Sequence, residues 1–553
     1  ILDRAVKRVN EKKNPDEVKV DIENLSLDDP KTFELLQRAD TTGVFQLESR
    51  GMRDYLRQLV PNNFEDIVSM NALYRPGALG MNMVDSYIDR KHGREEVTYG
   101  HDAVKKILST TYGVIVYQEQ VMQIAQELSG FTLGQADILR RAMGKKKKEE
   151  MEKLRSTFIE GAVSKEVNQN YAANLFDQIE QFAGYGFNRS HSVGYALIAY
   201  QTAWLKAHYP AEFMSSVLSC EMDSTDRIQL FVDDCRSIGL KVIKPDINNS
   251  VYKFIDLDSK TILYGLGAIK SIGESLVNQI TSSREDGPFL DLVDFCLRVG
   301  SNRVNKRVLT ALIGSGAMDC FGKREDLFNQ ISSALKKSEQ VTERDKSKIK
   351  DLFGNNEKVL DEVHDRLSDS ETIDLLAAEW NSLGFYLESH PIDKKKREVR
   401  KMCGFFISEL ETETHSQRVA GMLMHLNVRQ GRKGRFAFAT IDDSSGRLEI
   451  SIWADIFDRH RGILKKGQLI VIEGVVEKDN YSIGAEKPTF KMVADRILTF
   501  DEARNEYLKH IRITLDPDTV NIEEIATGIK ALSNNQEGSP VLISFLGKKA
   551  KAD

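Results

Sequence analysis

The chain has 553 residues, a length that predicts three or four domains at roughly 150 residues each. Its 77 Lys and Arg residues against 83 Asp and Glu residues give a net charge of −6, and 29% of residues are charged and 41% hydrophobic. This balance is ordinary for a soluble globular protein and excludes a wholly disordered, collagenous or coiled-coil chain. No apolar run of about 18 residues predicts a membrane span, and we expect a cytoplasmic protein. The five cysteines form no C-x-x-C pair, so neither a disulfide framework nor a zinc site is predicted.

Residues 1 to about 250 are predicted to be mostly helical. Tyr117, Val121, Ile124 and Leu128 recur at helical spacing, and Gly130 follows as a stop signal. Similar patterns recur up to about residue 210, so this region is expected to be a large α domain.

A basic stripe lies on the next predicted helix, which Thr132 and Gln135 open as a capping box. Between residues 140 and 148 six of nine side chains are basic and none is acidic. At 100° per residue the apolar and basic residues of this helix fall on opposite sides: Ile138, Leu139, Ala142 and Met143 against Arg141, Lys145 and Lys148. Arginine forks match phosphate oxygens, so the stripe predicts a site for a triphosphate or a nucleic-acid backbone. A solvated helix face is the alternative.

The segment 184–192 (GYGFNRSHS) places aromatic, hydroxyl, cationic and imidazole groups between two predicted helices. Such a loop can offer a stacking ring and hydrogen-bond donors to a nucleotide. The alternative is a capping turn in which Ser192 caps the following helix and Tyr185 and Phe187 belong to the core.

Glycines recur at short intervals along the chain from about residue 260. The segment 263–273 (LYGLGAIKSIG) precedes an apolar-periodic helix, which predicts a helix-hairpin-helix with its backbone N–H groups turned to a phosphate. Gly265, Gly267, Lys270 and Gly273 are therefore candidate DNA-binding residues, with a plain helical hairpin as the alternative. Residues 335–375 are polar and charged, and predict a linker or a solvated helix.

From residue 418 to about 500 the sequence alternates with period two and predicts five strands, with a helix between the third and fourth. This order is that of an oligonucleotide-binding (OB) barrel. The predicted first hairpin, 429–435, has four basic residues among seven and is a candidate DNA-binding loop through Arg429, Arg432, Lys433 and Arg435; a solvated turn is the alternative. Residues 510–553 predict strand, helix and strand.

No catalytic metal or nucleophile pattern is present. The ten histidines form no H-E-x-x-H, no D-x-D pattern has apolar flanks, and Asp442–Asp443 is better explained as turn chemistry. The patterns alone predict a modular nucleic-acid-binding protein and leave its reaction open.

Five motifs in order resemble the α subunit of bacterial DNA polymerase III, the C-family replicative polymerase: 42–52 (TGVFQLESRGM), 74–77 (YRPG), 112–120 (YGVIVYQEQ), 139–146 (LRRAMGKK) and 187–192 (FNRSHS). The modules that follow are also similar in order. The resemblance implies a mainly α fingers domain at 1–250, a helix-hairpin-helix duplex-binding region at 251–335, a linker at 336–415, an all-β OB domain at 416–500 and a truncated α/β terminal domain at 501–553.

The resemblance also implies roles for the basic stripe and the loop after it. Arg140 and Arg141 would contact the triphosphate of the incoming dNTP, Lys145 and Lys146 would add positive charge, and His191 would lie over the nucleotide. The catalytic palm aspartates of the family, which bind its Mg²⁺ ions, would precede Ile1, so we expect this part to bind nucleotide and primer-template DNA but not to polymerise alone.

Partners follow from the same resemblance. The sliding clamp would bind through Leu352 and Phe353, in a segment where Ile349 stands in place of the family's Gln. The τ subunit of the clamp loader would dock on the terminal domain, which here stops short of the family's last helix. The proofreading exonuclease would bind only through the missing N-terminal domain. Two other interpretations stay open: a non-catalytic DNA-binding scaffold, and an RNA-processing protein with the same two modules.

Overall fold

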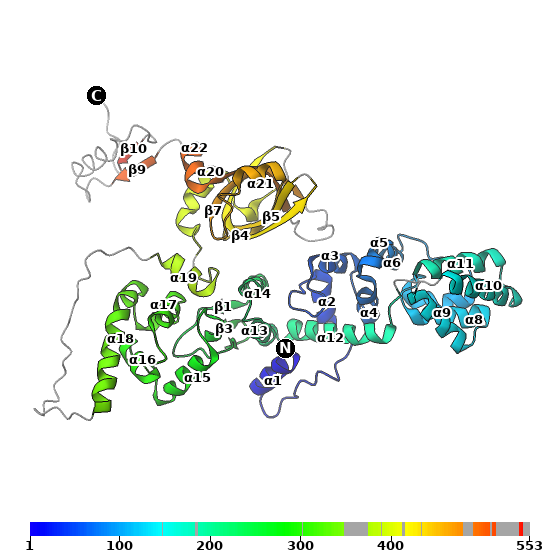
Figure 1. Cartoon of the computed structure of the whole chain (residues 1–553), viewed down its shortest axis with the longest axis horizontal. Helices are drawn as coiled ribbons and strands as arrows, with labels where there is room; N and C mark the ends of the chain where they lie inside the picture. Colours follow the sequence, from blue (N-terminus) through cyan, green and yellow to red (C-terminus); the bar gives the residue numbers. More distant parts are fainter. Residues whose placement is uncertain are drawn as a thin grey trace, which may run out of the picture. The chain divides into compact units, whose positions relative to one another are not determined.

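The computed structural model describes residues 1–145, 148–182, 186–300, 302–347, 374–388, 390–411, 415–432, 434–478, 490–508, 511–515 and 541–545. These residues fall into two compact units, Ile1–Leu387 and Glu388–Asp553. Figure 1 shows their helices and strands, coloured along the sequence and labelled where there is room.

The first unit begins with a long helical region, as predicted. Its helices are α1 (Leu2–Lys12), α2 (Pro30–Arg38), α3 (Arg50–Leu59), α4 (Phe64–Leu73), α5 (Pro76–Gly80), α6 (Met83–Lys91), α7 (Asp102–Leu108), α8 (Gln118–Ser129), α9 (Leu133–Lys145), α10 (Lys148–Ser164), α11 (Gln169–Phe182), α12 (Arg189–His208), α13 (Pro210–Cys220) and α14 (Thr225–Ser237), with a 3-10 turn η1 at Ser109–Thr111. The predicted stop at Gly130 is confirmed, because this residue ends α8 in the left-handed region at φ +71°. The predicted capping box of Thr132 and Gln135 is also present, with Gln135 N–H donating to Thr132 Oγ1 over 3.3 Å.

Two hydrophobic cores lie within this helical region, and α1, α13 and α14 pack into a third that continues into the rest of the first unit. The first gathers around α12, which packs against α2 and α4 through Ala196, Ala199 and Tyr200. The second lies among α8 to α11, with Phe158 and Phe176 fully buried at its centre. Because α12 buries only part of its circumference, its remaining face is open.

The rest of the first unit combines a small sheet with short helices. Strands β1 (Lys241–Ile243), β2 (Ile255–Asp256) and β3 (Thr261–Leu263) form a sheet in the order β1-β3-β2, in which β1 and β3 are parallel. The helical elements that follow are η2 (Leu266–Ala268), α15 (Glu274–Ser283), η3 (Arg284–Asp286), α16 (Leu292–Val299), α17 (Lys306–Gly314), η4 (Asp319–Phe321), α18 (Arg324–Ser347) and α19 (Leu375–Leu383). Helices α18 and α19 enter the region that the sequence predicts as a linker.

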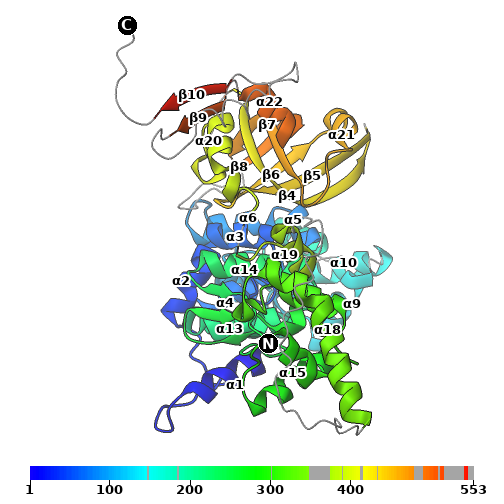
Figure 2. The ribbon, with the colours of Figure 1, turned by 90° about the vertical axis from the view of Figure 1, so that its left-hand side faces the viewer.

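The second unit is built around a closed five-stranded barrel (Figure 2). Its elements are η5 (Asp393–Lys395), α20 (Lys396–Cys403), η6 (Ile407–Glu409), β4 (Gln417–Gly431), β5 (Gly434–Asp442), β6 (Arg447–Ile452), α21 (Ala454–His460), β7 (Leu469–Lys478), β8 (Phe490–Thr499), α22 (Phe500–Tyr507), β9 (Ile511–Leu515) and β10 (Val541–Phe545). The barrel order is β4-β5-β6-β8-β7, with α21 between the third and fourth strands, which confirms the predicted OB barrel. Strands β9 and β10 form a parallel pair, and the helix predicted between them lies outside the described residues.

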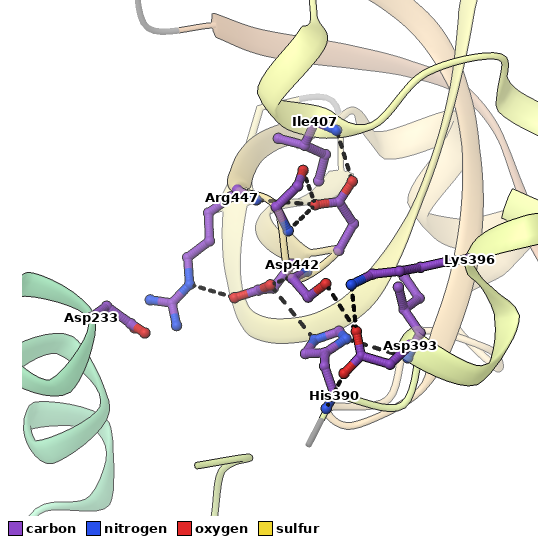
Figure 3. Close-up of polar contacts among 12 residues, drawn as sticks. Asp233, His390, Asp393, Lys396, Ile407, Asp442 and Arg447 are labelled. Carbon is purple, nitrogen blue, oxygen red and sulfur yellow. Dashed lines mark hydrogen bonds and ion pairs between the residues drawn. The ribbon is translucent and has the colours of Figure 1, made fainter. Parts of the chain in front are cut away.

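The turn between β5 and β6 confirms the interpretation of the paired aspartates. Asp443 accepts the backbone N–H groups of Ser445 and Gly446 over 2.9 and 3.0 Å, and also that of Ile407 over 2.7 Å. Asp442 accepts Nε–H of Arg447 over 2.9 Å (Figure 3). Both carboxylates therefore serve the turn, and Asp443 also attaches η6 to the barrel.

A candidate nucleotide site and two candidate nucleic-acid surfaces

The first residues of α8 bind the backbone of residues 186–187, the segment that leads into α12. Tyr117 and Phe187 form a parallel β-bridge, and Gln118 N–H donates to the carbonyl of Phe187 over 2.9 Å. The Gln118 side-chain amide donates to the carbonyl of Gly186, also over 2.9 Å. These contacts fix Phe187 next to the first turn of α8.

Asn188 caps α12. Its Oδ1 accepts the backbone N–H of His191 over 2.8 Å, and its Nδ2 donates to Glu119 over 2.7 Å. The interpretation that placed the cap at Ser192 is wrong, because Ser192 is a buried residue inside the helix whose hydroxyl donates to the carbonyl of Val68 over 2.6 Å. The cap thus lies three residues before His191 and leaves this ring exposed at the first turn.

Arg140 and Arg141 share one carboxylate on the surface of α9. Their Nη2 atoms lie 2.8 and 2.9 Å from the two oxygens of Asp137. The side chains of Arg140 and Arg141 are 36% and 60% exposed, so neither is locked in a core. The hydrogen bond from Arg140, aided by the charge of Arg141, holds the pKa of Asp137 below its usual range. At neutral pH the trio therefore carries a net charge of +1.

Arg140 also connects α9 to the neighbouring segment. Its Nη1 donates to Oε1 of Gln118 over 3.4 Å, the same amide that holds Gly186. The predicted apolar side of α9 is correct for Leu139 and Ala142 but wrong for Ile138, which is 42% exposed. Lys145 ends α9 with its side chain not described, and Lys146 lies outside the described residues.

Four rings form a continuous row beside this segment, which we call the aromatic ladder: Phe187, His191, Tyr195 and Phe45. Successive ring centroids are 5.5, 4.5 and 5.5 Å apart. The guanidinium of Arg75 lies 4.2 Å from the centroid of Phe187. Of these residues the sequence singled out only His191 as a site residue; Phe45 and Arg75 were part of recognised motifs, and Tyr195 is one helical turn after His191.

The four predicted residues of the helix-hairpin-helix differ in their surroundings. Gly265 is buried, and a Cβ there would come within 2.7 Å of the Tyr252 and Lys253 backbone. A Cβ at Gly267 would come within 2.3 Å of the Tyr252 ring. Close packing accounts for both glycines. Lys270 and Gly273, by contrast, are exposed, and a Cβ at Gly273 would meet no described atom within 4 Å beyond its chain neighbours.

Two arginines that the sequence did not single out lie beside this exposed hairpin. Arg307 donates to the hydroxyl of Ser271 over 2.9 Å, and Arg303 donates to that of Ser275 over 3.2 Å. Across the part of the chain that the structure describes, no carboxylate forms an ion pair with either arginine. Their charge and the N-terminus of α15 at Glu274 therefore lie on one surface.

The first hairpin of the barrel is basic and aromatic. Arg429, Arg432 and Arg435 are exposed, and Lys433 lies outside the described residues. On β5 the alternate residues Ala437 and Ala439 point into the barrel and are buried, so their neighbours face outward.

The outward residues of β5 continue this surface. Phe436 lies 5.6 Å from Phe438 and 5.8 Å from Trp453, measured between ring centroids, and the guanidinium of Arg429 lies 5.7 Å from Phe438. Trp453 is 52% exposed. The strand alternation of residues 436–438 was a usable signal for these rings, but only the basic residues of the hairpin were predicted as binding residues.

Metal and clamp sites have no counterpart in what the structure describes. The described residues contain no group of three His, Cys, Asp or Glu side chains placed to hold a metal ion, so they do not fit the Mg²⁺ site that the family implies, and no step is assigned to a metal on this chain. Leu352 and Phe353 lie outside the described residues. No described helix is long and apolar enough to cross a membrane.

Comparison with known proteins gives three family matches in chain order. Residues 1–166 match the finger domain of the bacterial DNA polymerase III alpha subunit, residues 239–327 match a helix-hairpin-helix motif, and residues 417–499 match an OB-fold nucleic acid binding domain. The DNA polymerase III alpha subunit of Pseudomonas fluorescens is 40% identical over 100% of this chain and 49% of its own length. That of Escherichia coli K12 is 41% identical over 100% of this chain and 48% of its own length.

The chain belongs to the bacterial DNA polymerase III α-subunit family. It spans about half the length of the curated relatives it matches. Within the family match, the fingers model covers α1 to α10 and so includes Arg140 and Arg141, whereas the helix-hairpin-helix model covers the exposed hairpin at Lys270 and Gly273.

Proposed function

We propose that this chain supplies the nucleotide-binding fingers and two DNA-binding modules of a cytoplasmic replicative DNA polymerase, which copies a template in the 5′ to 3′ direction from dNTPs. The carboxylates that hold catalytic Mg²⁺ in that enzyme belong to residues other than these 553. On this proposal the chain binds but does not polymerise alone.

The exposed arginine pair carries the nucleotide part of the proposal. Arg140 and Arg141 present two forked guanidinium groups from one helix, next to a segment of exposed rings. Forked donors bind phosphate oxygens in pairs, and each charge-assisted contact contributes about 1.5 to 3 kcal/mol. Asp137 leaves the trio a single net positive charge, which suits a polyanion that displaces the carboxylate from both forks. Lys145, Lys146 and His191 are proposed to add to this site.

Two surfaces support binding to primer-template DNA. The hairpin with Lys270, Gly273, Arg303 and Arg307 offers exposed backbone and cations, which suits the phosphates of a duplex. The barrel surface offers rings beside arginines, and this combination suits single-stranded nucleic acid, whose bases stack on aromatic side chains.

The remaining partners are proposed from the family alone. They are the sliding clamp through Leu352 and Phe353, the clamp loader's τ subunit at the terminal domain, and the proofreading exonuclease through residues outside this chain.

Binding of dATP and of inorganic tripolyphosphate to this chain, measured by calorimetry at low salt, tests the nucleotide site. We expect Arg140→Ala to weaken both affinities at least about tenfold, the loss of one charge-assisted contact. Arg155→Ala is the matched control, because Arg155 is 37% exposed and also pairs with a single aspartate, Asp177, over 2.9 Å.

Equal affinities of the wild type, Arg140→Ala and Arg155→Ala would refute the site. The alternative of a non-catalytic scaffold predicts that the chain binds primed DNA, with log K falling steeply with log salt, yet binds neither dATP nor tripolyphosphate.

A further inference from the structure

We infer that helix α20 carries a further binding site for the phosphate backbone of double-stranded DNA. The site consists of Lys394, Arg397 and Lys401, which we call the α20 cation row. It lies outside the three segments that match family models, and it adds a DNA contact to the proposed function. The inference does not depend on the nucleotide site.

The segment before the barrel is strongly basic. Between residues 394 and 401 six of eight side chains are basic and one is acidic. Lys394 lies in η5, and Arg397 and Lys401 follow in α20 at spacings of three and four residues. Residues at these spacings are neighbours on a helix surface. At about 1.5 Å per residue, the three cations form one row about 10 Å long.

The opposite face of α20 attaches the cation row to the barrel. Val399, Met402 and Cys403 are buried in a core that also contains residues of β4, β7, β8 and α22 (Figure 2). The side chains of the cation row are exposed. The row therefore has a fixed position on the outside of the second unit.

The fold uses the other charged residues of this segment. Each has a partner within the second unit: Lys396 pairs with Asp393 over 2.7 Å (Figure 3), Arg400 with Glu409, and Glu398 with Arg504 over 2.7 Å, while Lys395 lies 4.4 Å from the centroid of the Phe500 ring. Within the part of the chain that the structure describes, by contrast, no carboxylate forms an ion pair with Lys394, Arg397 or Lys401.

The stability of α20 does not account for the cation row. Like charges three or four residues apart on a helix repel one another, which applies to Lys394 with Arg397 and to Arg397 with Lys401. Lys394 and Arg397 also lie at the N-terminal end of α20, where the helix dipole disfavours cations. A polyanion bound along the row would remove both penalties.

The chemistry of the row suits phosphates. The aromatic residues that follow α20, Phe405 and Phe406, are half-buried, so the row offers charge rather than a stacking surface. Cationic side chains of this kind contact the DNA backbone and not the bases. One strand of B-form DNA presents a phosphate about every 3.4 Å along the axis, so a row of about 10 Å spans about three successive phosphates.

The cation row is separate from the basic hairpin of the barrel. The core under α20 includes Ala420 on β4, and Arg429 of the hairpin lies nine residues later on the same strand. At about 3.3 Å per residue, the strand places the two sites up to about 30 Å apart. A ligand that occupies the hairpin therefore does not cover the row, and protection of the row reports a contact of its own.

Lysine footprinting of the whole chain tests the site directly. An acetylating reagent modifies exposed lysines, and mass spectrometry gives the rate at each position. We expect a duplex of about 20 base pairs to slow acetylation of Lys394 and Lys401 severalfold, because bound phosphates cover both amines. Lys105 and Lys106, which are exposed on α7, should react at an unchanged rate. Unchanged rates at Lys394 and Lys401 in the presence of bound duplex would overturn the inference.

The salt dependence of duplex binding counts the contacts. Lys394→Gln/Arg397→Gln/Lys401→Gln should reduce the slope of log K against log salt by about 2.7, the value for three lost phosphate contacts. Lys394→Arg/Lys401→Arg keeps the three charges and should keep the wild-type slope. A wild-type slope in the triple glutamine variant would also overturn the inference.

A charge-matched control separates the row from the net charge of the protein. Lys31→Gln/Lys105→Gln/Lys106→Gln removes the same charge from exposed lysines on α2 and α7. This variant should leave the slope close to that of wild type. An equal reduction in both triple variants would mean that net charge alone acts, and the assignment of a site to α20 would fail.

Two further comparisons identify the ligand. Polyglutamate should protect Lys394 and Lys401 less than the duplex does, because an extended chain carries one charge per about 3.3 Å and duplex DNA one per about 1.7 Å. Equal protection would assign the row to an acidic protein and overturn the inference. If wild type binds duplex while both lysines stay reactive, the proposed function stands and the inference alone fails. If wild type binds no duplex, both fail.

Discussion

Asp319→Asn should destabilise the helix-hairpin-helix region at neutral pH and lose that effect in acid. Asp319 follows α17 and joins two other elements: Lys244 after β1, over 2.7 Å, and Arg324 at the start of α18, through two bonds of 2.8 Å each. The Asp319 side chain is 23% exposed and that of Arg324 14%. The Asp319 carboxylate therefore links the chain after β1 to the start of α18, the two segments that flank the exposed hairpin at Lys270 and Gly273 in sequence.

The size of the effect follows from this partial burial. An exposed ion pair contributes about 0 to 1 kcal/mol, and breaking a fully buried one costs about 3 to 5 kcal/mol. Asp319 lies between these limits, and its Arg324 bond is bidentate, so we expect Asp319→Asn to lower the free energy of unfolding by about 2 kcal/mol at pH 7.

The pH dependence has a definite sign. Burial raises the pKa of Asp319, but the hydrogen bonds from Arg324 and Lys244 outweigh it and hold this pKa below its usual range. A carboxyl whose pKa is lowered on folding stabilises the protein above its unfolded pKa of about 3.9, and this stabilisation is lost as the pH falls through the lower folded value. The wild-type protein should therefore exceed Asp319→Asn in stability at pH 5 to 7, and the difference should shrink below about pH 4.

Hydrogen exchange of peptides from α17 and the first turns of α18 measures the opening free energy of this region alone. Asp89→Asn is the control, because Asp89 pairs with Arg94 over 2.7 Å with both side chains about half exposed. That variant should leave the exchange of α17 and α18 unchanged. Equal protection of wild type and Asp319→Asn at pH 7, or a difference that grows towards acid, would refute the reasoning.

Two predictions address binding. Trp453→Ala should weaken single-stranded DNA binding by roughly five- to tenfold, because it removes a stacking ring, whereas Trp453→Phe keeps a ring and should bind like wild type. A fluorescence-anisotropy titration measures the affinity. An unchanged affinity in Trp453→Ala would exclude the barrel surface around Trp453 as the binding site. Asp137→Asn should raise tripolyphosphate affinity roughly threefold at low salt, and less at high salt, because the arginine trio gains one net positive charge. Calorimetry tests this, with Asp177→Asn as the matched control, and a fall in affinity would mean that Asp137 positions the arginines instead.

The barrel was predictable because its signal is local. The alternation with period two around Phe436 and Phe438 predicts the strand β5, although the set that faces the interior is Ala437 and Ala439 and not these larger rings. The helix stop at Gly130 is local in the same way. The sheet of β1, β2 and β3 was not predictable, since strands of two or three residues are too short to show alternation and two of them pair in parallel across about 20 residues.

Features that depend on contacts between distant residues could not be predicted from the sequence. Ile138 projects next to Ala142 on a helical wheel, yet only the arc covered by α8 and α10 is buried. Gly265 and Gly273 look alike in sequence, but one meets backbone and the other open space, which only the fold decides. The ladder was missed for the same reason, because Phe45 and Tyr195 are 150 positions apart in the chain.

Helix α12 explains how separate motifs form one site. Its buried residues Ala196, Ala199 and Tyr200 pack against α2 and α4, and this packing brings Phe45 and Arg75, from two other motifs, to the edge of its open face. Helix α12 buries one face, but its Tyr195, Leu197 and Ile198 lie on partly open surface. This exposed apolar area is unfavourable in water. The free energy of covering that area is available to whatever binds there, so the packing that builds this helical region also leaves a surface that favours a bound apolar or aromatic group.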